Sequence, residues 1–299
     1  MAMAVSGAAA SPNMGFHSSP PLAFLMTLFN VRLGRWFANP TRRVRRVDGK
    51  PVPAPTSPPV GLWYLLRELF GLTDARSPYL YLSDGGHFEN LGVYELVRRR
   101  CRLVIAVDAG ADGQFDFSDL GNAIRKCATD LNVDIEIDVS RIEVIKQTEF
   151  SGAHCVTGRI RYDKIDAGGE VGTLLYIKPS LTGTEFADIV NYRKTNKTFP
   201  HQSTADQWFD ETQFETYRAL GYDIGRIVMT PAVAAAAPKQ DGRPGRLDIA
   251  SLCRALHACW DSDTGPQRPL FLVSDRRSAE RRRLQDLPAH ERRESDRRA

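Results

Sequence analysis

Residues 79–92 place an Asp-Gly-Gly sequence between a short apolar run and a helical pattern. The apolar run at 79–83 predicts a buried strand, and a helix is expected over about 89–100. Because glycine reaches backbone conformations that other residues rarely adopt, the sequence predicts a sharp turn that holds Asp84 at a strand end. A carboxylate there suits a general base at the rim of an α/β sheet.

The structural alternative is that Asp84 only caps a turn, which is a common role of aspartate before glycine. The residues expected to support it are Gly85, Gly86, His87, Glu89 and Asn90. His87 and Glu89 either orient a substrate and assist proton transfer or occupy a first helical turn, where the helix dipole favours Glu89. Asn90 is a candidate hydrogen-bond partner for Asp84.

The pattern after this turn predicts an α/β fold. The run at 103–107 is continuously apolar and largely β-branched, as in strands buried on both faces. With the strand at 79–83 and the intervening helix, it predicts a right-handed crossover unit. A helix is expected at 117–131, and further strands at 133–139, 155–162 and 171–177.

The strand at 155–162 alternates apolar and polar residues, which predicts one exposed face. The central, mostly parallel sheet is therefore expected to become mixed. Other helices are expected at 20–37, 60–70, 185–195 and 203–220, with a proline-rich and arginine-rich loop at 39–59. The apolar segment 21–31 is too short to span a bilayer, and a core helix is favoured over a lipid-facing one.

A resemblance to the patatin-like phospholipases, in the bacterial branch similar to cytosolic phospholipase A enzymes, extends to about residue 222. It rests on residues 6–15 (SGAAASPNMG), 84–92 (DGGHFENLG), 107–110 (VDAG), 175–183 (LYIKPSLTG) and 199–209 (FPHQSTADQWF). The resemblance implies a three-layer sandwich, a lipid or acyl-ester substrate and a serine–aspartate dyad without a cofactor. Asp84 matches the general base of that dyad.

The chain departs from this family at the nucleophile. No glycine-rich oxyanion loop and no G-x-S-x-G sequence precede Asp84. Ser6, in A-V-S-G-A, is a poor candidate, because a nucleophile elbow needs glycine at its sharp turn and a buried strand before it. We therefore expect this chain to be the C-terminal part of a catalytic domain whose nucleophile is not in the chain.

The expected organisation is an acyl hydrolase domain portion at 1–230, a linker at 231–246 and a short helical extension at 247–274. Residues 275–299 form a charged tail with nine arginines and six acidic residues, for which we expect disorder. That tail carries +3 of the formal net charge of +4. The remainder is nearly neutral, so no nucleic-acid partner is expected.

Three further polar residues lie in the family-like stretches. Asp108 ends the strand at 103–107 and either faces the same cleft as Asp84 or acts as a cap. Lys178 and His201 have no role that spacing indicates.

The five cysteines are scattered, which favours reduced thiols in the cytoplasm. A metal interpretation of Cys253, His257 and Cys259 on one helix lacks a second ligand pair, so no metal is expected.

Two functions stay open at this point. The first is a lipid acyl-ester hydrolase, cytoplasmic with peripheral membrane contact as an option, of which this chain supplies the aspartate. The second is a non-catalytic protein of the same fold that binds lipid or protein. Fold resemblance alone does not separate them, because function belongs to the site.

Overall fold

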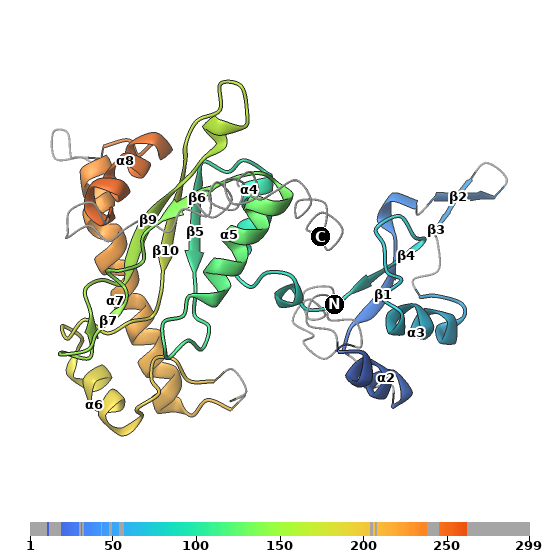
Figure 1. Ribbon diagram of the computed structural model, residues 1–299, viewed down its shortest axis with the longest axis horizontal. Coiled ribbons are helices and arrows are strands. Elements are labelled where there is room, and N and C mark those ends of the chain that lie inside the picture. Colours follow the sequence, from blue (N-terminus) through green and yellow to red (C-terminus); the bar gives the residue numbers. More distant parts are fainter. Residues whose placement is uncertain are drawn as a thin grey trace, which may run out of the picture. The chain divides into compact units, whose positions relative to one another are not determined.

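The computed structural model of the chain describes residues 11, 19–29, 31, 33–42, 44–47, 50–53, 57–203, 206, 208–237 and 245–261. The chain divides into two compact units, Met1–Asn90 and Leu91–Ala299, whose elements are labelled in Figure 1.

A four-stranded sheet forms the centre of the 91–299 unit. Its strand order is β5 (Leu103–Val107), β10 (Gly172–Ile177), β9 (Cys155–Ile160) and β6 (Ile135–Ile137). Only β5 and β10 are parallel, and the other two pairings are antiparallel. The prediction of an α/β fold with a mixed sheet is confirmed, whereas a mostly parallel sheet is not found among the described strands.

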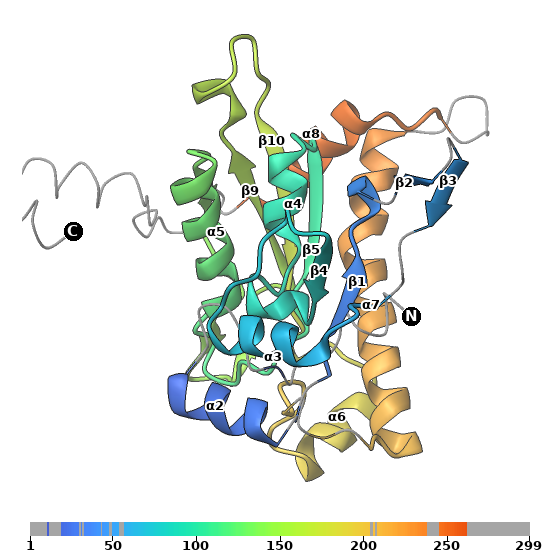
Figure 2. The same cartoon turned by 90° about the vertical axis from the view of Figure 1, so that its right-hand side faces the viewer.

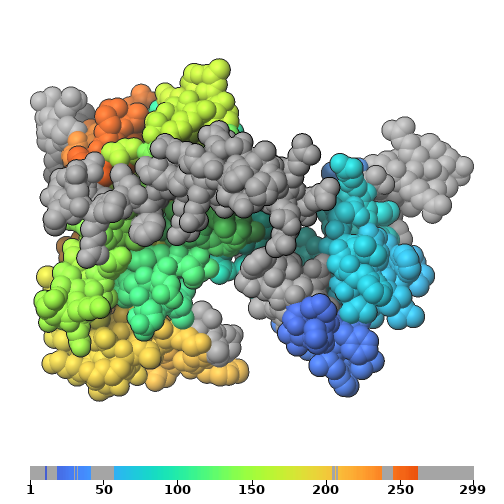
Figure 3. Space-filling view, in the orientation of Figure 1, coloured from blue at the N-terminus to red at the C-terminus, as the bar shows by residue number. Residues whose placement is uncertain are grey.

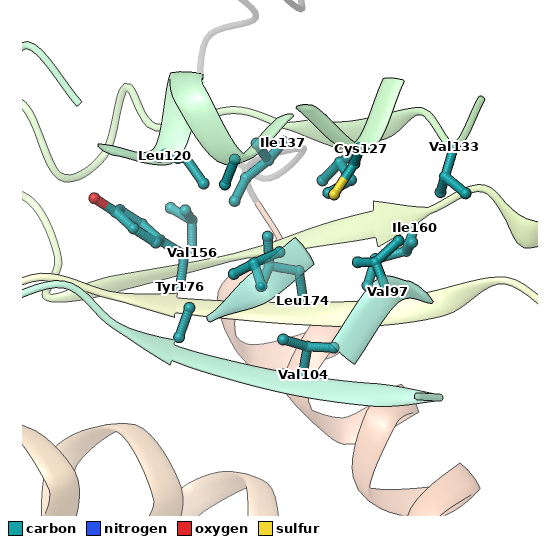
Figure 4. Packing of buried hydrophobic residues seen from close by; sticks show 14 of the residues in the cluster. Val97, Val104, Leu120, Cys127, Val133, Ile137, Val156, Ile160, Leu174 and Tyr176 are labelled. Atoms are coloured by element: carbon teal, nitrogen blue, oxygen red, sulfur yellow. The ribbon is translucent and has the colours of Figure 1, made fainter. Parts of the chain in front are cut away.

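Helices cover both faces of this sheet (Figure 1). On one face, α4 (Val93–Arg98) and α5 (Ser118–Asp130) enclose a first core cluster that includes Leu174 and Tyr176. Figure 4 shows this packing, with Cys127 of α5 directed at the strands. On the other face, a second core cluster includes Leu175 and Ile177. Side chains of β10 thus alternate between two cores, and all six of its residues are buried.

The second core cluster is covered by α6 (Ala187–Thr195), α7 (Glu211–Ala236) and α8 (Ile249–Trp260). The helix α6 packs near the start of the long α7 (Figure 2). The helix expected at 203–220 instead begins at Glu211, because the Asp210 side chain caps it through the Gln213 N–H. It also runs through Pro231 to Ala236, so the first part of the expected linker is helical. The expected tail lies outside the described residues.

Burial of β9 corrects another expectation. Thr157 is buried and only Arg159 in this strand is exposed, since α8 packs on the face that the sequence pattern left open. A short hairpin, β7 (Val144–Ile145) with β8 (Phe150–Ser151), lies between β6 and β9. The strand expected at 133–139 is reduced to β6.

The 1–90 unit is built on β1 (Arg35–Ala38) paired antiparallel with β4 (Tyr79–Leu82). Its other elements are the helices α2 (Pro20–Leu28) and α3 (Gly61–Leu69) and the hairpin of β2 (Val44–Val47) with β3 (Lys50–Pro53). Aromatic packing holds the strands: the Trp36 ring lies 4.7 Å from that of Tyr64 and 5.3 Å from that of Tyr81. The Trp36 indole also donates to Glu68 at 2.6 Å.

β4 pairs with β1, where its tyrosines pack on Trp36, and the crossover unit of β4 with β5 stays a prediction. Two predictions for the 1–90 unit are wrong. The helix expected at 20–37 ends at Leu28 and is followed by β1; Gly34 lies against Tyr81, where a Cβ atom would not fit. The loop expected at 39–59 contains a β-hairpin.

The helix α2 exposes most of its apolar side chains, which corrects its interpretation as a core helix. Only Ala23 of α2 is buried, and α2 lies at the surface in Figure 3. The exposed apolar residues of α2 and the position after it are Leu22, Phe24, Leu25, Leu28 and Phe29. Within the described part of the chain, no helix has the length and apolar character needed to cross a bilayer.

Two glycine substitutions test the packing of the sheet. In Gly158→Ala, the new Cβ would lie 2.8 Å from the Ile137 Cβ and 2.9 Å from the Glu136 carbonyl oxygen. We expect a loss of about 1–3 kcal/mol in the free energy of unfolding, because the backbone of β6 must shift. In the matched control Gly221→Ala, on α7, the Cβ meets nothing within 4 Å. That change should stabilise by up to about 1 kcal/mol through helix propensity. Urea denaturation measures both, and equal effects would contradict this packing.

Candidate functional site

Asp84 directly follows β4 and caps the 3-10 helix Gly85–His87. Its Oδ1 accepts a hydrogen bond from the Gly86 backbone N–H at 2.8 Å. The side chain is half-buried, and no described residue donates to Oδ2. Asp84 therefore caps a turn, as the structural alternative expected. The same geometry fixes the carboxylate at a strand end and leaves one oxygen able to accept a proton.

The two glycines of the turn do not adopt the glycine-specific backbone conformations that the sequence predicts for them. Neither Gly85 nor Gly86 has a positive φ, and a Cβ at Gly85 would meet nothing within 4 Å. A Cβ at Gly86 would collide with the Asn90 side chain and lie 3.2 Å from Asp84 Oδ1. Gly86 is thus needed for space. The left-handed conformation occurs at Gly92, with φ 69°, where α4 begins.

The supporting residues gather around this turn. The Asn90 side chain lies against Gly86, beside the Asp84 turn, and its hydrogen bond to Asp84 stays a prediction. Nδ1 of His87 lies 3.3 Å from the Ser83 hydroxyl. Glu89 is buried, and its backbone N–H donates to the Gly85 carbonyl. Because α4 begins only at Val93, His87 and Glu89 do not occupy its first turn, which was one of the two alternatives for them.

Ser6 lies outside the described residues. Ser11, in the same family-like stretch, is buried, and its hydroxyl lies 2.7 Å from the Tyr81 hydroxyl. Tyr81 belongs to β4, the strand that ends at Asp84. Ser11 therefore contacts the strand that positions the candidate base.

A second polar cluster lies in the 91–299 unit, where the parallel strands β5 and β10 end side by side. Asp108 follows β5 and Lys178 follows β10. The Lys178 ammonium lies 3.0 Å from Asp108 Oδ2 and 3.1 Å from Asp112 Oδ2, and its side chain is 1% exposed. Burying a charge is tolerated where opposite charges and hydrogen bonds surround it.

Further hydrogen bonds complete this cluster. The Tyr176 hydroxyl donates to Asp108 Oδ2 at 2.5 Å; burial, and then this bond, raise the pKa of Tyr176. Asp112 accepts the backbone N–H groups of Asp116 and Phe117. Burial acts to raise the pKa of Asp112, but these bonds and Lys178 outweigh it and hold the pKa below the usual 3.8.

His201 packs beside the cluster. Its ring lies 4.8 Å from that of Phe115, and both ring nitrogens are buried. Burial lowers the pKa of His201 and the nearby Lys178 lowers it further, while the Gly110 carbonyl acts in the opposite direction. The loop that Asp112 holds contains two non-glycine residues at positive φ, Phe115 and Phe117. Such strain persists only where surrounding contacts impose it.

Sequence reasoning found Asp108, Lys178 and His201 but missed Asp112 and Tyr176. The signal for Asp112 was available, since D-A-G-A-D places a second carboxylate on the loop at the end of β5. The signal for Tyr176 was its position two residues before Lys178 in a buried strand. The Lys178 ammonium is held between two carboxylates, and that of Asp112 also anchors the loop after β5, so the geometry supports a role in fixing the loop. Asp84 belongs to the other unit.

The cysteine and histidine residues of α8 lie in two different environments. Cys253 and His257 line a cavity, whereas Cys259 packs against the second core cluster. Across the described ranges, no three His, Cys, Asp or Glu side chains are placed to hold a metal ion.

Comparisons of the chain with protein-family models, with curated proteins and with solved structures found no match.

The lowered pKa of His201 predicts acid sensitivity. The unfolded state takes up a proton near pH 6.5 and the folded state only at lower pH. The stability that His201 contributes is therefore present above pH 6.5 and is lost as the pH falls below it, by at most about 1.4 kcal/mol per pH unit. His201→Phe, which retains a ring beside Phe115, should flatten the fall in unfolding free energy between pH 6.5 and 5. Urea titrations at each pH measure this, and an unchanged slope would contradict it.

Proposed function

We propose that this chain carries the general-base part of a lipid acyl-ester hydrolase, with Asp84 as the proton acceptor of a serine–aspartate dyad. The observation that carries this proposal is the geometry of Asp84. One carboxylate oxygen is fixed by the Gly86 N–H and the other has no donor among the described residues. A base must be held in place and yet keep an oxygen free to accept the proton.

In the proposed reaction, a serine hydroxyl attacks the acyl carbonyl while Asp84 accepts its proton. The proton then passes to the leaving alcohol, and water releases the acyl group from the serine. Backbone N–H groups must stabilise the oxyanion. Neither a G-x-S-x-G serine nor a glycine-rich loop is in this sequence, so the proposal assigns both to a segment outside it.

The architecture of the 91–299 unit supports a patatin-like sandwich as the fold. Helices lie on both faces of a mixed sheet, in three layers. The exposed apolar side chains of β5 further support a larger domain, to which other segments contribute. Ile105 and Val107, on the β5 face that is shared with the second core cluster, are 46% and 61% exposed. Strands of parallel sheets are normally covered on both faces.

A non-catalytic lipid-binding or protein-binding role is the second candidate, and one observation favours it. Besides those of α2, large apolar side chains are exposed on and next to α3, at Val60, Leu62, Trp63, Phe70 and Leu72. Contiguous exposed apolar surface marks sites that contact membranes or proteins. In this alternative, Asp84 is a turn cap only.

The first test uses the chain as its sequence stands. Because nucleophile and oxyanion donors are missing, we expect no hydrolysis of p-nitrophenyl esters and no labelling by a fluorophosphonate probe. Mass spectrometry of the treated protein measures the labelling. Stoichiometric modification of Ser6 would show that the chain contains its own nucleophile and would overturn this assignment.

The second test replaces Asp84 in the full-length protein, expressed from its own gene. Asp84→Asn retains the acceptor for the Gly86 N–H but loses basicity, so we expect esterase kcat to fall by a factor on the order of 10² to 10⁴ or more. The melting temperature should change little. The two candidate functions differ here, because a binding protein has no esterase activity to lose.

Asp138→Asn is the matched control. Asp138 is also half-buried, and its Oδ1 accepts the N–H two residues on, that of Ser140, at 2.9 Å. This variant should retain the parent kcat. If Asp84→Asn and Asp138→Asn behave alike, in activity and in melting temperature, Asp84 is a turn residue and the dyad assignment fails.

A further inference from the structure

A cavity of about 500 Å³ opens at the end of the β5–β10 pair opposite to the Asp108–Lys178 cluster. Its floor is formed at Arg102, just before β5, Thr173 of β10 and Arg159 of β9; Thr173 and Arg159 are paired in register. The helix α8 forms a wall with Ala250, Cys253, Arg254 and His257, and Glu170 and Val171 complete the lining. The size falls within the range of small-ligand sites.

Three arginines line this cavity, and two of them are paired with a carboxylate. Arg102 pairs with Glu170 at 2.6 Å, and Arg159 pairs with Asp261 at 2.5 Å. Arg254 hydrogen-bonds only to the Ser251 hydroxyl, at 3.0 Å, among the described residues. Asp248 lies close enough to Arg254 to interact with it electrostatically. Arg102 and Arg254 are exposed, so neither is committed to the core.

Neutral hydrogen-bonding groups line the same space. The Thr173 hydroxyl lies 3.2 Å from His257 Nε2, and His257 Nδ1 lies 3.6 Å from Asp261 Oδ2. Burial lowers the pKa of His257, and Arg159 lowers it further against the opposing effect of Asp261. At neutral pH the cavity is therefore lined by a neutral imidazole that is hydrogen-bonded to a hydroxyl. Val171, Ala250 and the Cys253 side chain add apolar surface.

We propose that this cavity binds a phosphate monoester, with Arg102, Arg159 and Arg254 around the phosphoryl oxygens. Guanidinium groups bind phosphate through paired charge-assisted hydrogen bonds. A phosphoryl group has three terminal oxygens, so it can accept from arginines that come from three elements, whereas a carboxylate has two oxygens. The apolar lining accommodates the organic part of the ester.

The binding test uses the full chain with phenyl phosphate and inorganic phosphate, in isothermal titration calorimetry at constant ionic strength. We expect saturable binding of phenyl phosphate, weaker binding of inorganic phosphate and much weaker binding of benzoate. Vesicles of phosphatidylcholine with phosphatidic acid distinguish a lipid head group from a free ester as the source. The absence of saturable binding of phosphate in every form would overturn the proposal.

Two variants locate the site. Arg254→Gln and Arg102→Gln remove exposed charges from different elements, and each should weaken phenyl phosphate binding about five- to tenfold, as expected for one lost charge-assisted contact. The matched control is Arg218→Gln on α7, which is exposed, pairs with Glu215 and lies outside the cavity. It removes the same charge and should leave affinity unchanged. Equal weakening in all three variants would reduce the binding to nonspecific charge and overturn the proposal.

A chemical readout within the cavity is independent of affinity measurements. A bound phosphate ester covers the Cys253 thiol, so alkylation by iodoacetamide should slow severalfold when phenyl phosphate is present. Cys259, on the same helix but against the second core cluster, should react at an unchanged rate. Site-resolved mass spectrometry measures both rates. Protection of neither cysteine, or of both equally, would place the ligand elsewhere.

Discussion

The buried contact of Lys178 with Asp108 and Asp112 is the interaction on which the 91–299 unit depends. It lies where β5 and β10 end, and β10 is the strand that separates the two cores. Taking an ammonium group from water costs several kcal/mol, which one carboxylate alone offsets poorly. The second carboxylate and the Tyr176 hydroxyl complete the set. Asp112 in turn holds the loop after β5 through two backbone N–H groups.

The Asp84 carboxylate is also held in a fixed orientation, but it is not fully buried. A single backbone hydrogen bond from Gly86 orients the carboxylate, and the group keeps contact with water. This difference separates the two aspartates that the sequence suggested as partners. Asp108 has both a cation and a hydroxyl on Oδ2, and its Oδ1 accepts the Gly110 N–H, so both oxygens have donors. Asp84 has one oxygen without a donor among the described residues, and this is why the proposed chemistry is assigned to it.

Much of the 91–299 unit could be predicted from the sequence. The strand at 103–107, the helix near 117–131 and the strand near 171–177 have strong, uninterrupted patterns, and the structure confirms them. The failures share a physical cause, which is that long-range packing overrides local pattern. β1 replaces the end of the helix expected at 20–37, since its Trp36 packs on the tyrosines of β4, and β9 is buried by a helix from about 90 residues later. Pro231 does not end α7, because the Ala232 side chain packs into the second core cluster.

For the candidate sites, the sequence identified individual residues but not which of them lie together. Asp84 was apparent because glycines mark a turn, and its capping role follows from local geometry alone. The Lys178 cluster required knowledge that β5 and β10 are neighbours, although their paired residues lie 70 positions apart in the chain. The arginine cavity required the same knowledge and the position of α8. Both ends of β10 thus collect charge, but they use it differently. At Lys178 one ammonium group is enclosed by two carboxylates, which suits a structural role. At Arg254 the guanidinium group is exposed and, among the described residues, hydrogen-bonds only to a hydroxyl, which suits recognition of an anion.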